Sequence, residues 1–353
     1  MMLGRTSIQK KGGHKAMKIM GIILACAAIL SVGIYFYAAT HTQIVVGLLQ
    51  NLATSATGNP INSFDPFNPP MAGLKENGQY LISEIRYGTE YPNSYLDIIY
   101  PNEDLEADRP TLFYFHGGGF FSGSKNMGDP IAASESTALL DDLCAQGYNI
   151  VNVDYALVPD CHFPVPLIQA NQVFAYIMEH KDEYHLNMGK VIIMGSSAGA
   201  IMVSQLGSVI TNPDYAALLG IIPALQPEQV RTVVLDDAPL DYESFTLGCK
   251  FLIGNYVRNT IFLSKEEISR YNNILHVTPD YPAAVLLGSE YRHDMNAMHD
   301  ALEAHGVENI LIDPLAEHGE EKPHCFVANE RTDPIAKEAF DRLAAFLAEK
   351  TGA

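Results

Sequence analysis

The chain has 353 residues, which is enough for one large α/β domain and an additional segment. Its formal net charge is −19, and the first 18 residues carry five basic side chains and no acidic one, so the remainder carries −24. Such a surface repels nucleic acid and anionic polymers, which excludes a nucleic-acid partner from the expected functions. A high net charge also helps to keep a protein in solution.

The N-terminus reads as a membrane anchor. Residues 1–18 form a basic tail, and residues 19–39 follow as an uncharged apolar run that is long enough to span a bilayer as a helix. A basic flank before an apolar span places the N-terminus in the cytoplasm and the rest of the chain outside. The run is longer than a typical signal-peptide core and lacks a small-x-small cleavage site behind it, which favours an uncleaved single-pass signal anchor over a cleaved signal and a secreted protein.

Residues 40–78 connect this span to the rest of the chain. The first part is apolar as far as Leu52, and it is expected either to extend the membrane helix or to lie over the domain that follows as a lid. The second part contains Gly58-Asn59-Pro60 and the proline-rich stretch 65–70, a composition typical of a linker.

From residue 79 to residue 353 strands alternate with helices, which predicts an α/β fold with a mostly parallel sheet covered on both faces. The expected strands are 81–87, 95–100, 111–115, 149–155, 190–195, 230–236, 283–288 and 309–313, of which the first two form an antiparallel pair. The expected helices include 130–146, 166–180 and 335–347. The stretch at about 242–281 is longer than a connection requires and is expected to form a cap.

Residues 195–199, Gly-Ser-Ser-Ala-Gly, match the G-x-S-x-G pattern. An apolar run typical of a buried strand precedes them and a run with helical spacing follows, and this strand–turn–helix context makes the match meaningful. A serine nucleophile on a strained turn needs small residues two positions to either side, so that strand and helix can approach. We therefore expect Ser197 to be a nucleophile at a helix N-terminus, where free N–H groups favour negative charge.

A second glycine-rich stretch, His-Gly-Gly-Gly-Phe at residues 116–120, follows an expected buried strand. Consecutive glycines let the backbone come close to a ligand and turn its N–H groups toward it, as the stabilisation of an oxyanion requires. The expected donors are the amides of Gly117 and Gly118, joined by that of Ala198 directly after the nucleophile.

The two motifs together resemble those of the α/β-hydrolase esterases of the hormone-sensitive-lipase type and their bacterial carboxylesterase relatives. Residues 153–159, Val-Asp-Tyr-Ala-Leu-Val-Pro, with Phe163-Pro164 beyond them, are similar to the D-Y-R-L-A-P…F-P segment of that family. The resemblance covers roughly residues 80–350, and it implies an α/β-hydrolase fold and the hydrolysis of short-chain acyl esters. Ser196 departs from the pattern because many members carry Asp before the nucleophile; this should tune the turn without removing the chemistry.

The nucleophile needs a base and an acid, in the chain order Ser, acid, His. His324 lies after the last expected strand, in a Pro-His-Cys-Phe sequence similar to the family's H-x-F, and it is the candidate base; His318 lies in the same loop. An imidazole there would take the proton of Ser197 and return it to the leaving alcohol.

Several carboxyl groups compete for the role of the acid. Glu290 is slightly favoured, because it stands at the family's G-x-D position after the penultimate parallel strand. Asp294 is the more usual residue type but is also a good N-cap for the helix that follows. Asp236 and Asp237, at the end of an earlier strand, are the third choice.

Nothing in the pattern predicts a cofactor or a metal. The cysteines at 144, 161, 249 and 325 are scattered without C-x-x-C spacing, and neither a dinucleotide nor a P-loop fingerprint occurs. The favoured function is therefore a serine carboxylesterase that cleaves a small ester by covalent catalysis. The alternatives are a catalytically impaired, membrane-tethered binding module and a serine peptidase on the same scaffold.

Overall fold

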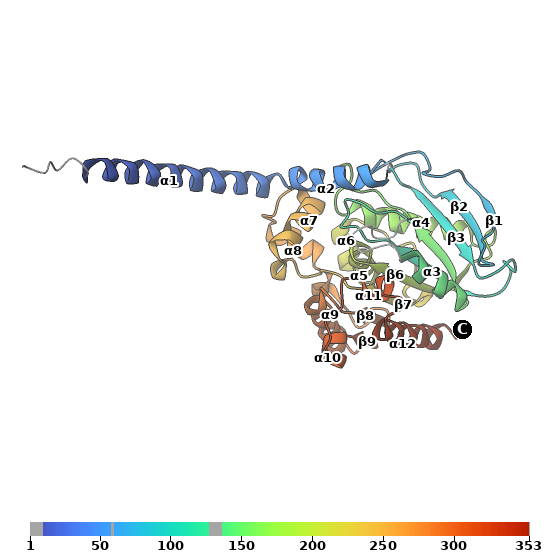
Figure 1. Ribbon diagram of the computed structural model, residues 1–353. Coiled ribbons are helices and arrows are strands. Elements are labelled where there is room, and N and C mark those ends of the chain that lie inside the picture. Colours follow the sequence, from blue (N-terminus) through green and yellow to red (C-terminus); the bar gives the residue numbers. More distant parts are fainter. Residues whose placement is uncertain (1–9, 58–59, 127–135, 353) are drawn as a thin grey trace, which may run out of the picture.

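A nine-stranded sheet forms the centre of the computed structural model, which describes residues 10–57, 60–126 and 136–352 (Figure 1). Its strand order is β1-β2-β3-β5-β4-β6-β7-β8-β9. The strands are β1 (Ala72–Leu74), β2 (Tyr80–Arg86), β3 (Tyr95–Tyr100), β4 (Pro110–Phe115), β5 (Asn149–Val153), β6 (Asn187–Ser196), β7 (Val230–Asp236), β8 (Ala284–Leu287) and β9 (Asn309–Ile312). The eight strands expected from the sequence are all present, and β3 and β7 have the expected bounds.

The sheet is antiparallel at one end and parallel through the rest. β1, β2 and β3 pair antiparallel, and β3 joins β5 in the same sense, whereas the strands from β5 to β9 in the sheet order run parallel. The predicted α/β fold with a mostly parallel sheet and an antiparallel pair at its start is thus confirmed. Parallel strands end at the same edge, so the loops after β4, β6, β7 and β9 gather on one side of the sheet.

Helices cover both faces of the sheet, because alternate residues of each buried strand point to opposite sides. In β4, Phe113 and Phe115 belong to one apolar cluster, while Leu112 and Tyr114 belong to the other. The first cluster includes side chains of α4 (Val165–His180) and α5 (Ala198–Thr211), and the second those of α3 (Ser136–Ala145) and α12 (Pro334–Thr351). The remaining helices of this part are α6 (Pro213–Leu219), η1 (Pro227–Gln229), α9 (Arg292–Ala304), α10 (Pro314–His318) and α11 (Phe326–Asn329). The first residues of the helix expected at 130–146 lie outside the described residues.

The C-terminal helix α12 illustrates how local sequence sets its ends. Asp333 caps its first turn by accepting hydrogen bonds from the amides of Ile335 and Ala336, and Pro334 stands at the first helical position, where no backbone donor is needed. Gly352 ends the helix in the left-handed conformation. The apolar face of α12 packs on the sheet as its spacing predicts.

Two helices precede the sheet and meet at His41. α1 (Lys10–Thr40) projects from the body of the molecule, whereas α2 (Thr42–Thr57) lies along it (Figure 1). Among the described residues, α1 alone contains a window long and apolar enough to cross a membrane, Ile23–Thr40, and almost none of that window is buried. The helix begins before the expected span 19–39 and takes in part of the basic tail; residues 1–9 of that tail lie outside the described residues.

The segment between α2 and β2 is closely attached to the body. Asn62 donates from Nδ2 to the carbonyl of Leu157 at 2.8 Å, and Asn93 donates to the carbonyl of Ile61 at 3.0 Å. β1 then adds a short strand to the edge of the sheet. Part of the segment expected as a linker therefore packs as an integral strand and loop, which the prolines in its sequence did not indicate.

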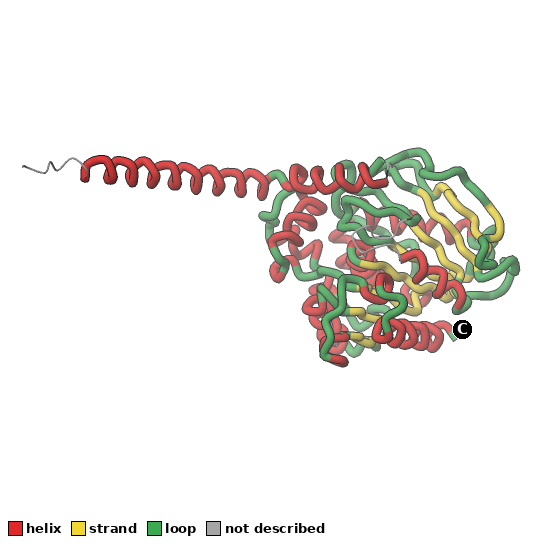
Figure 2. The backbone as a smooth tube through the Cα atoms, viewed as in Figure 1, coloured by secondary structure: helices red, strands yellow, loops and turns green. Residues whose placement is uncertain are grey.

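Helical elements occupy the stretch expected as a cap: η2 (Tyr242–Ser244), α7 (Leu247–Arg258), α8 (Lys265–Tyr271) and η3 (Asn273–His276). α7 lies against α2, and the two helices stand side by side where the long N-terminal helix reaches the body of the molecule (Figure 2). Asn255 of α7 accepts a hydrogen bond from Thr42 Oγ1 at 3.2 Å.

Candidate active site

Ser197 occupies the turn between β6 and α5 in a conformation that a non-glycine residue rarely adopts, with φ 54° and ψ −119°. Its amide donates to the carbonyl of Asp236 at 2.8 Å, which fixes the turn against the end of β7. A Cβ at Gly199 would lie 1.9 Å from the carbonyl oxygen of Phe115, and one at Gly195 would lie 2.4 Å from Gly199. Close approach of the backbone of β4, β6 and α5 thus requires glycine at positions 195 and 199. Ser197 itself is partly exposed, whereas the residues before and after it are buried.

The glycine-rich loop after β4 lies next to this turn, because β4 and β6 are adjacent parallel strands with Phe115 opposite Gly195. Gly118 has φ 103°, and its carbonyl accepts the amides of Phe121 and Ser122, both at 3.1 Å. A Cβ at Gly118 would lie 2.1 Å from the carbonyl of Ser122, so only glycine fits there. The loop that carries Gly117 and Gly118 and the helix start at Ala198 therefore meet at one edge of the sheet.

His324 is held by Asp237, the residue that follows β7. Nδ1 of His324 lies 2.5 Å from Oδ2 of Asp237, so the tautomer protonated at Nδ1 donates to the carboxylate. Asp237 also accepts from the amide and hydroxyl of Ser289, at 2.9 and 2.6 Å, and from the amide of Tyr291 at 2.8 Å. Burial alone would raise the pKa of Asp237, but the hydrogen bond and charge of His324 and the Ser289 donors together hold the pKa below its usual value.

This geometry corrects the sequence-based choice of acid. Glu290 Oε2 lies 3.7 Å from His324 Nδ1 on a side chain that is 57% exposed, and the amide of Glu290 donates to Asp237. Asp294 points elsewhere and accepts from the amides of Leu240 and Asp241, at 2.9 and 2.7 Å. The loop after β8 thus presents N–H groups to Asp237 at the end of β7, a residue that the sequence offered only as part of the third choice.

One carbonyl group connects the serine turn to the histidine loop. The carbonyl oxygen of Asp236 accepts the amide of Ser197 and also lies 3.6 Å from the thiol of Cys325, the residue after His324. Ser197 and His324 therefore belong to two loops joined at the end of β7. A serine hydroxyl, an imidazole and a buried carboxylate brought together at the end of β7 are the groups that covalent acyl transfer needs.

Asp236 itself forms a buried polar network beneath the serine turn. The hydroxyl of Ser196 donates to Asp236 Oδ2 at 2.7 Å and accepts from the hydroxyl of Tyr114 at 3.1 Å. Burial is the main cause that raises the pKa of Asp236 to about 7, and the nearby charge of Asp237 acts in the same direction. Ser196, which departs from the family pattern, is thus the direct partner of this carboxyl group.

The raised pKa of Asp236 predicts a pH-dependent contribution to stability. Because the folded state binds the proton more tightly, this contribution is complete below the unfolded pKa of 3.8 and is lost as the pH rises through about 7. The apparent Tm of the wild type minus that of Asp236→Asn should therefore be smaller at about pH 8 than at about pH 5. Circular dichroism in detergent measures both Tm values. An equal difference between the two proteins at both pH values would contradict a raised pKa.

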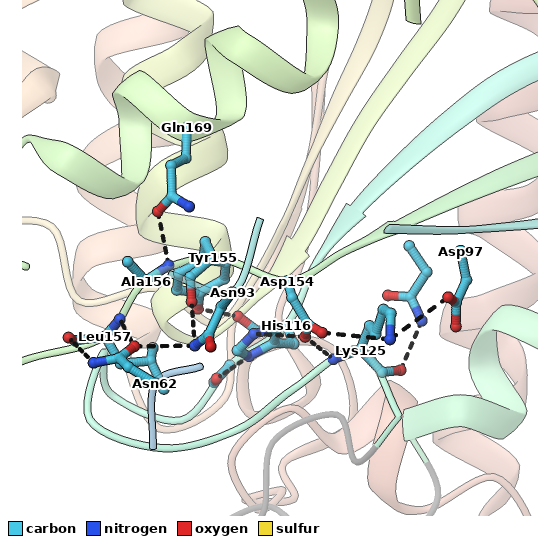
Figure 3. Close-up of polar contacts among 12 residues, drawn as sticks. Asn62, Asn93, Asp97, His116, Lys125, Asp154, Tyr155, Ala156, Leu157 and Gln169 are labelled. Carbon is cyan, nitrogen blue, oxygen red and sulfur yellow. Dashed lines mark hydrogen bonds and ion pairs between the residues drawn. The ribbon is translucent and has the colours of Figure 1, made fainter. Parts of the chain in front are cut away.

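A second buried cluster supports the glycine-rich loop (Figure 3). The Lys125 side chain is fully buried, and its Nζ lies 2.7 Å from Glu84 and 3.5 Å from both Asp97 and Asp154. Asp154 in turn lies 3.8 Å from Nε2 of His116, the first residue of the glycine-rich motif. Burial, partly offset by Lys125, raises the pKa values of Asp97 and Asp154 to about 6. Three carboxyl groups therefore share one ammonium group.

Tyr155 fixes His116 from the other side. The rings of the two residues stack with centroids 4.3 Å apart, and the Tyr155 hydroxyl donates to the carbonyl of His116 at 2.6 Å. Asp154 and Tyr155 belong to the segment that resembles the family's D-Y-R-L-A-P stretch, which the sequence identified only by resemblance. Their contacts show that this stretch holds the start of the glycine-rich loop.

Replacing Lys125 with Met should lower the free energy of unfolding by about 3–5 kcal/mol, because three buried carboxyl groups would lose the ammonium group that they share. Chemical denaturation followed by circular dichroism measures this change. Lys181→Met is the matched control, since Lys181 pairs with Asp182 on the surface and its loss should change stability by less than about 0.5 kcal/mol. Equal effects of the two substitutions would contradict the role of the cluster.

A pocket of about 390 Å³ opens beside His324. Charged side chains of both signs line it, including Glu290, Arg292, Asp313 and Lys322. Arg292 and Asp313 form an ion pair at 2.6 Å across it. The space on this side of the histidine is thus polar.

Potential metal ligands lie elsewhere. In residues 10–57, 60–126 and 136–352, one group could bring three such atoms together: Glu317, His318 and Glu338, all exposed. His318, the other histidine of the loop considered for the base, therefore faces the surface near Glu338, at 3.6 Å, rather than Asp237.

Comparison with known proteins agrees with this fold. A family model described as BD-FAE matches residues 96–242, a region that contains the glycine-rich loop and the serine turn. An acetyl esterase of Salmonella paratyphi B is 35% identical over 98 residues, which cover 27% of this chain and 28% of the Salmonella protein. The matched region thus spans about a quarter of the length of such curated relatives.

Solved structures resemble the chain over most of its length. Esterase B from Lactobacillus rhamnosis, in complex with a tributyrin phosphonate, superimposes with a TM-score of 0.67 at 17% identity, covering 88% of this chain and 94% of that one. An esterase of Pyrobaculum calidifontis gives a TM-score of 0.59 at 18% identity, with the same two coverages. At these identities the likeness establishes the fold.

Proposed function

We propose that this protein is a serine hydrolase that cleaves carboxylic esters. It has the α/β-hydrolase fold of solved esterases, and residues 96–242 match the BD-FAE family model. The observation that carries the proposal is the pairing of a strained, partly exposed Ser197 with a loop in which His324 is bonded to buried Asp237. Both loops are attached to the carbonyl of Asp236.

In the proposed reaction Ser197 Oγ attacks the ester carbonyl carbon while Nε2 of His324 takes the hydroxyl proton. Asp237 holds the imidazole through Nδ1 and stabilises the imidazolium that forms. The amides of Gly117, Gly118 and Ala198 donate to the oxyanion of the tetrahedral intermediate. Its collapse expels the alcohol, which receives the proton from His324, and water then attacks the acyl-serine by the same steps in reverse to release the acid.

A short acyl group is the proposed substrate feature. The named activity of the Salmonella relative is acetyl ester hydrolysis, and the acidic surface of this chain favours neutral or cationic esters over anionic ones. The polar pocket beside His324 supports an alcohol portion that carries hydroxyl groups.

We place the catalytic domain outside the cytoplasm, anchored by α1. The basic residues before α1 and the apolar window Ile23–Thr40 support this orientation. The helices at 242–276, together with α2, form the proposed cap: the ring of Tyr256 in α7 stacks on that of Phe120 with centroids 3.5 Å apart, and Gln50 of α2 donates to the carbonyl of Phe121 at 3.1 Å.

The test is hydrolysis of p-nitrophenyl acetate, butyrate and octanoate by the full chain in detergent, together with labelling by a fluorophosphonate probe. We expect turnover that is highest on the shortest esters and a single labelled residue, Ser197, identified by peptide mapping. Labelling without turnover on these esters would indicate a hydrolase of narrower substrate range. Neither turnover nor labelling would favour a binding module that has kept the fold.

A further inference from the structure

The loop after α7 is joined to the last turn of α1. The amide of Ile261 and the hydroxyl of Thr260 both donate to the carbonyl of Ala39, at 2.9 and 3.2 Å. In the opposite direction, the amide of Thr42 donates to the carbonyl of Asn259 at 3.2 Å. This loop, residues 259–263, therefore has a fixed position relative to the end of the apolar helix (Figure 1).

Phe262 in this loop lies beside α1 at a definite depth. Its ring stacks on that of Phe36 with centroids 6.2 Å apart and planes inclined by 16°. Phe36 precedes the end of the apolar window, Thr40, by four residues, which at about 1.5 Å per residue is about 6 Å along the helix axis. Tyr35 and Tyr37 flank Phe36, and such aromatic residues gather at the boundary between hydrocarbon and headgroups. When α1 spans a bilayer, Phe262 must lie at the depth of this boundary.

We propose that the loop of residues 259–263 dips into the lipid surface and that Phe262 is its membrane-contacting side chain. The inference rests on the proposed role of α1 as a membrane span. It adds that a second part of the chain, far from α1 in sequence, also enters the bilayer. The partner is the outer surface of the lipid bilayer.

The chemistry of the loop fits this environment. In a chain of net charge −19, residues 259–263 read Asn-Thr-Ile-Phe-Leu and carry no charge, and the Phe262 side chain is 52% exposed to solvent rather than packed in the core. Exposed aromatic surface of this kind gains free energy when it leaves water.

The backbone of the loop also tolerates a poorly hydrated environment, in which unpaired N–H groups are costly. The amide of Thr260 donates to the carbonyl of Gly254 at 3.2 Å, and the amide of Phe262 donates to Thr260 Oγ1 at 3.1 Å. Together with the bond from Ile261 to Ala39, three successive amides of the loop are satisfied inside the protein.

The chain contains no tryptophan, so each single-tryptophan variant has one indole emitter. The experiment uses the full chain with Phe262→Trp, reconstituted in phosphatidylcholine vesicles whose acyl chains are brominated either near the headgroup or near the bilayer centre. We expect a blue-shifted emission and at least about a twofold loss of intensity with the bromines near the headgroup, as an interfacial indole requires. The bromines near the centre should quench this variant less.

Two further variants make the result decisive. Leu74→Trp is the matched control, because Leu74 is 51% exposed but lies on β1 at the far edge of the sheet, and its emission should be unaffected by either lipid. Leu30→Trp, in the middle of the apolar window, should be quenched most by bromines near the bilayer centre and reports insertion of α1 itself.

If Leu30→Trp is quenched but Phe262→Trp behaves like Leu74→Trp, the loop lies in water and the inference is overturned. If Leu30→Trp is also unquenched, α1 does not insert, and the anchor and the inference fail together. Neither outcome depends on ester hydrolysis, so a failure of the proposed activity is recognised separately.

Discussion

Ser197→Ala should lower kcat/KM for p-nitrophenyl acetate by at least about three orders of magnitude, because the residual rate would depend on binding and oxyanion stabilisation alone. The hydroxyl of the adjacent Ser196 cannot replace it, since that hydroxyl donates to the buried carboxyl group of Asp236. Steady-state kinetics on protein matched for concentration and secondary structure measures the change.

The control for this substitution is Ser83→Ala, which removes a hydroxyl from β2 at the distant antiparallel end of the sheet. This variant should retain wild-type kinetics. A Ser197→Ala enzyme that keeps more than about a tenth of the wild-type rate would mean that ester cleavage does not proceed through Ser197.

Asp237→Asn should lower kcat by about three to four orders of magnitude while leaving the fold in place. The carboxylate accepts from His324 Nδ1 at 2.5 Å, which fixes the tautomer whose Nε2 can take a proton from serine. An asparagine amide that donates to Nδ1 would hold the opposite tautomer and would stabilise no imidazolium. The measurement is kcat at about pH 7.5 for an ester whose hydrolysis follows simple saturation.

Glu290→Gln and Asp294→Asn are the comparisons that distinguish the acids. Glu290 is exposed and lies 3.7 Å from the imidazole, so its neutralisation should change kcat by less than about tenfold. Asp294 accepts two backbone amides near β7, so Asp294→Asn should lower thermal stability more than the rate of the chemical step. A larger loss of kcat in Glu290→Gln than in Asp237→Asn would restore the sequence-based choice.

The order of strands and helices could be predicted from the sequence. Buried parallel strands appear as short apolar runs, and the segments between them show the apolar spacing of helices. The acid was not accessible in the same way. Carboxyl groups follow two neighbouring strands, β7 and β8, and the sequence does not reveal which group faces the histidine loop. That choice depends on the left-handed backbone of Asp237, with φ 59°, and on four donors from residues 289–291 that surround its carboxylate. The doublet Asp236-Asp237 at the end of a buried strand was the available signal.

Other features depend on contacts that no local pattern contains. Lys125 and its three carboxylate partners come from separate places in the chain, and each alone resembles an ordinary surface residue. The sequence of α2 is equally compatible with an extension of the membrane helix and with a lid. In the structure, the side-chain amide of Gln50 donates to the carbonyls of Phe121 and Val158 and so attaches α2 to the domain. Three-residue β1 is too short to show a period of two.

In the proposed anchored enzyme, the junction at His41 would determine how far Ser197 can move from the membrane. A single residue, His41, separates α1 from α2. The hydrogen bonds that Ala39 accepts from residues 260 and 261, and the one that Thr42 donates to Asn259, leave no freely rotating tether between the two helices. A flexible linker would let an anchored enzyme search a hemisphere whose radius grows with the square root of linker length. If α1 spans the bilayer as proposed, a stiff stalk would instead keep Ser197 at one height above the bilayer and in one orientation. The proposed enzyme would then meet substrates by lateral diffusion within a thin layer next to the membrane.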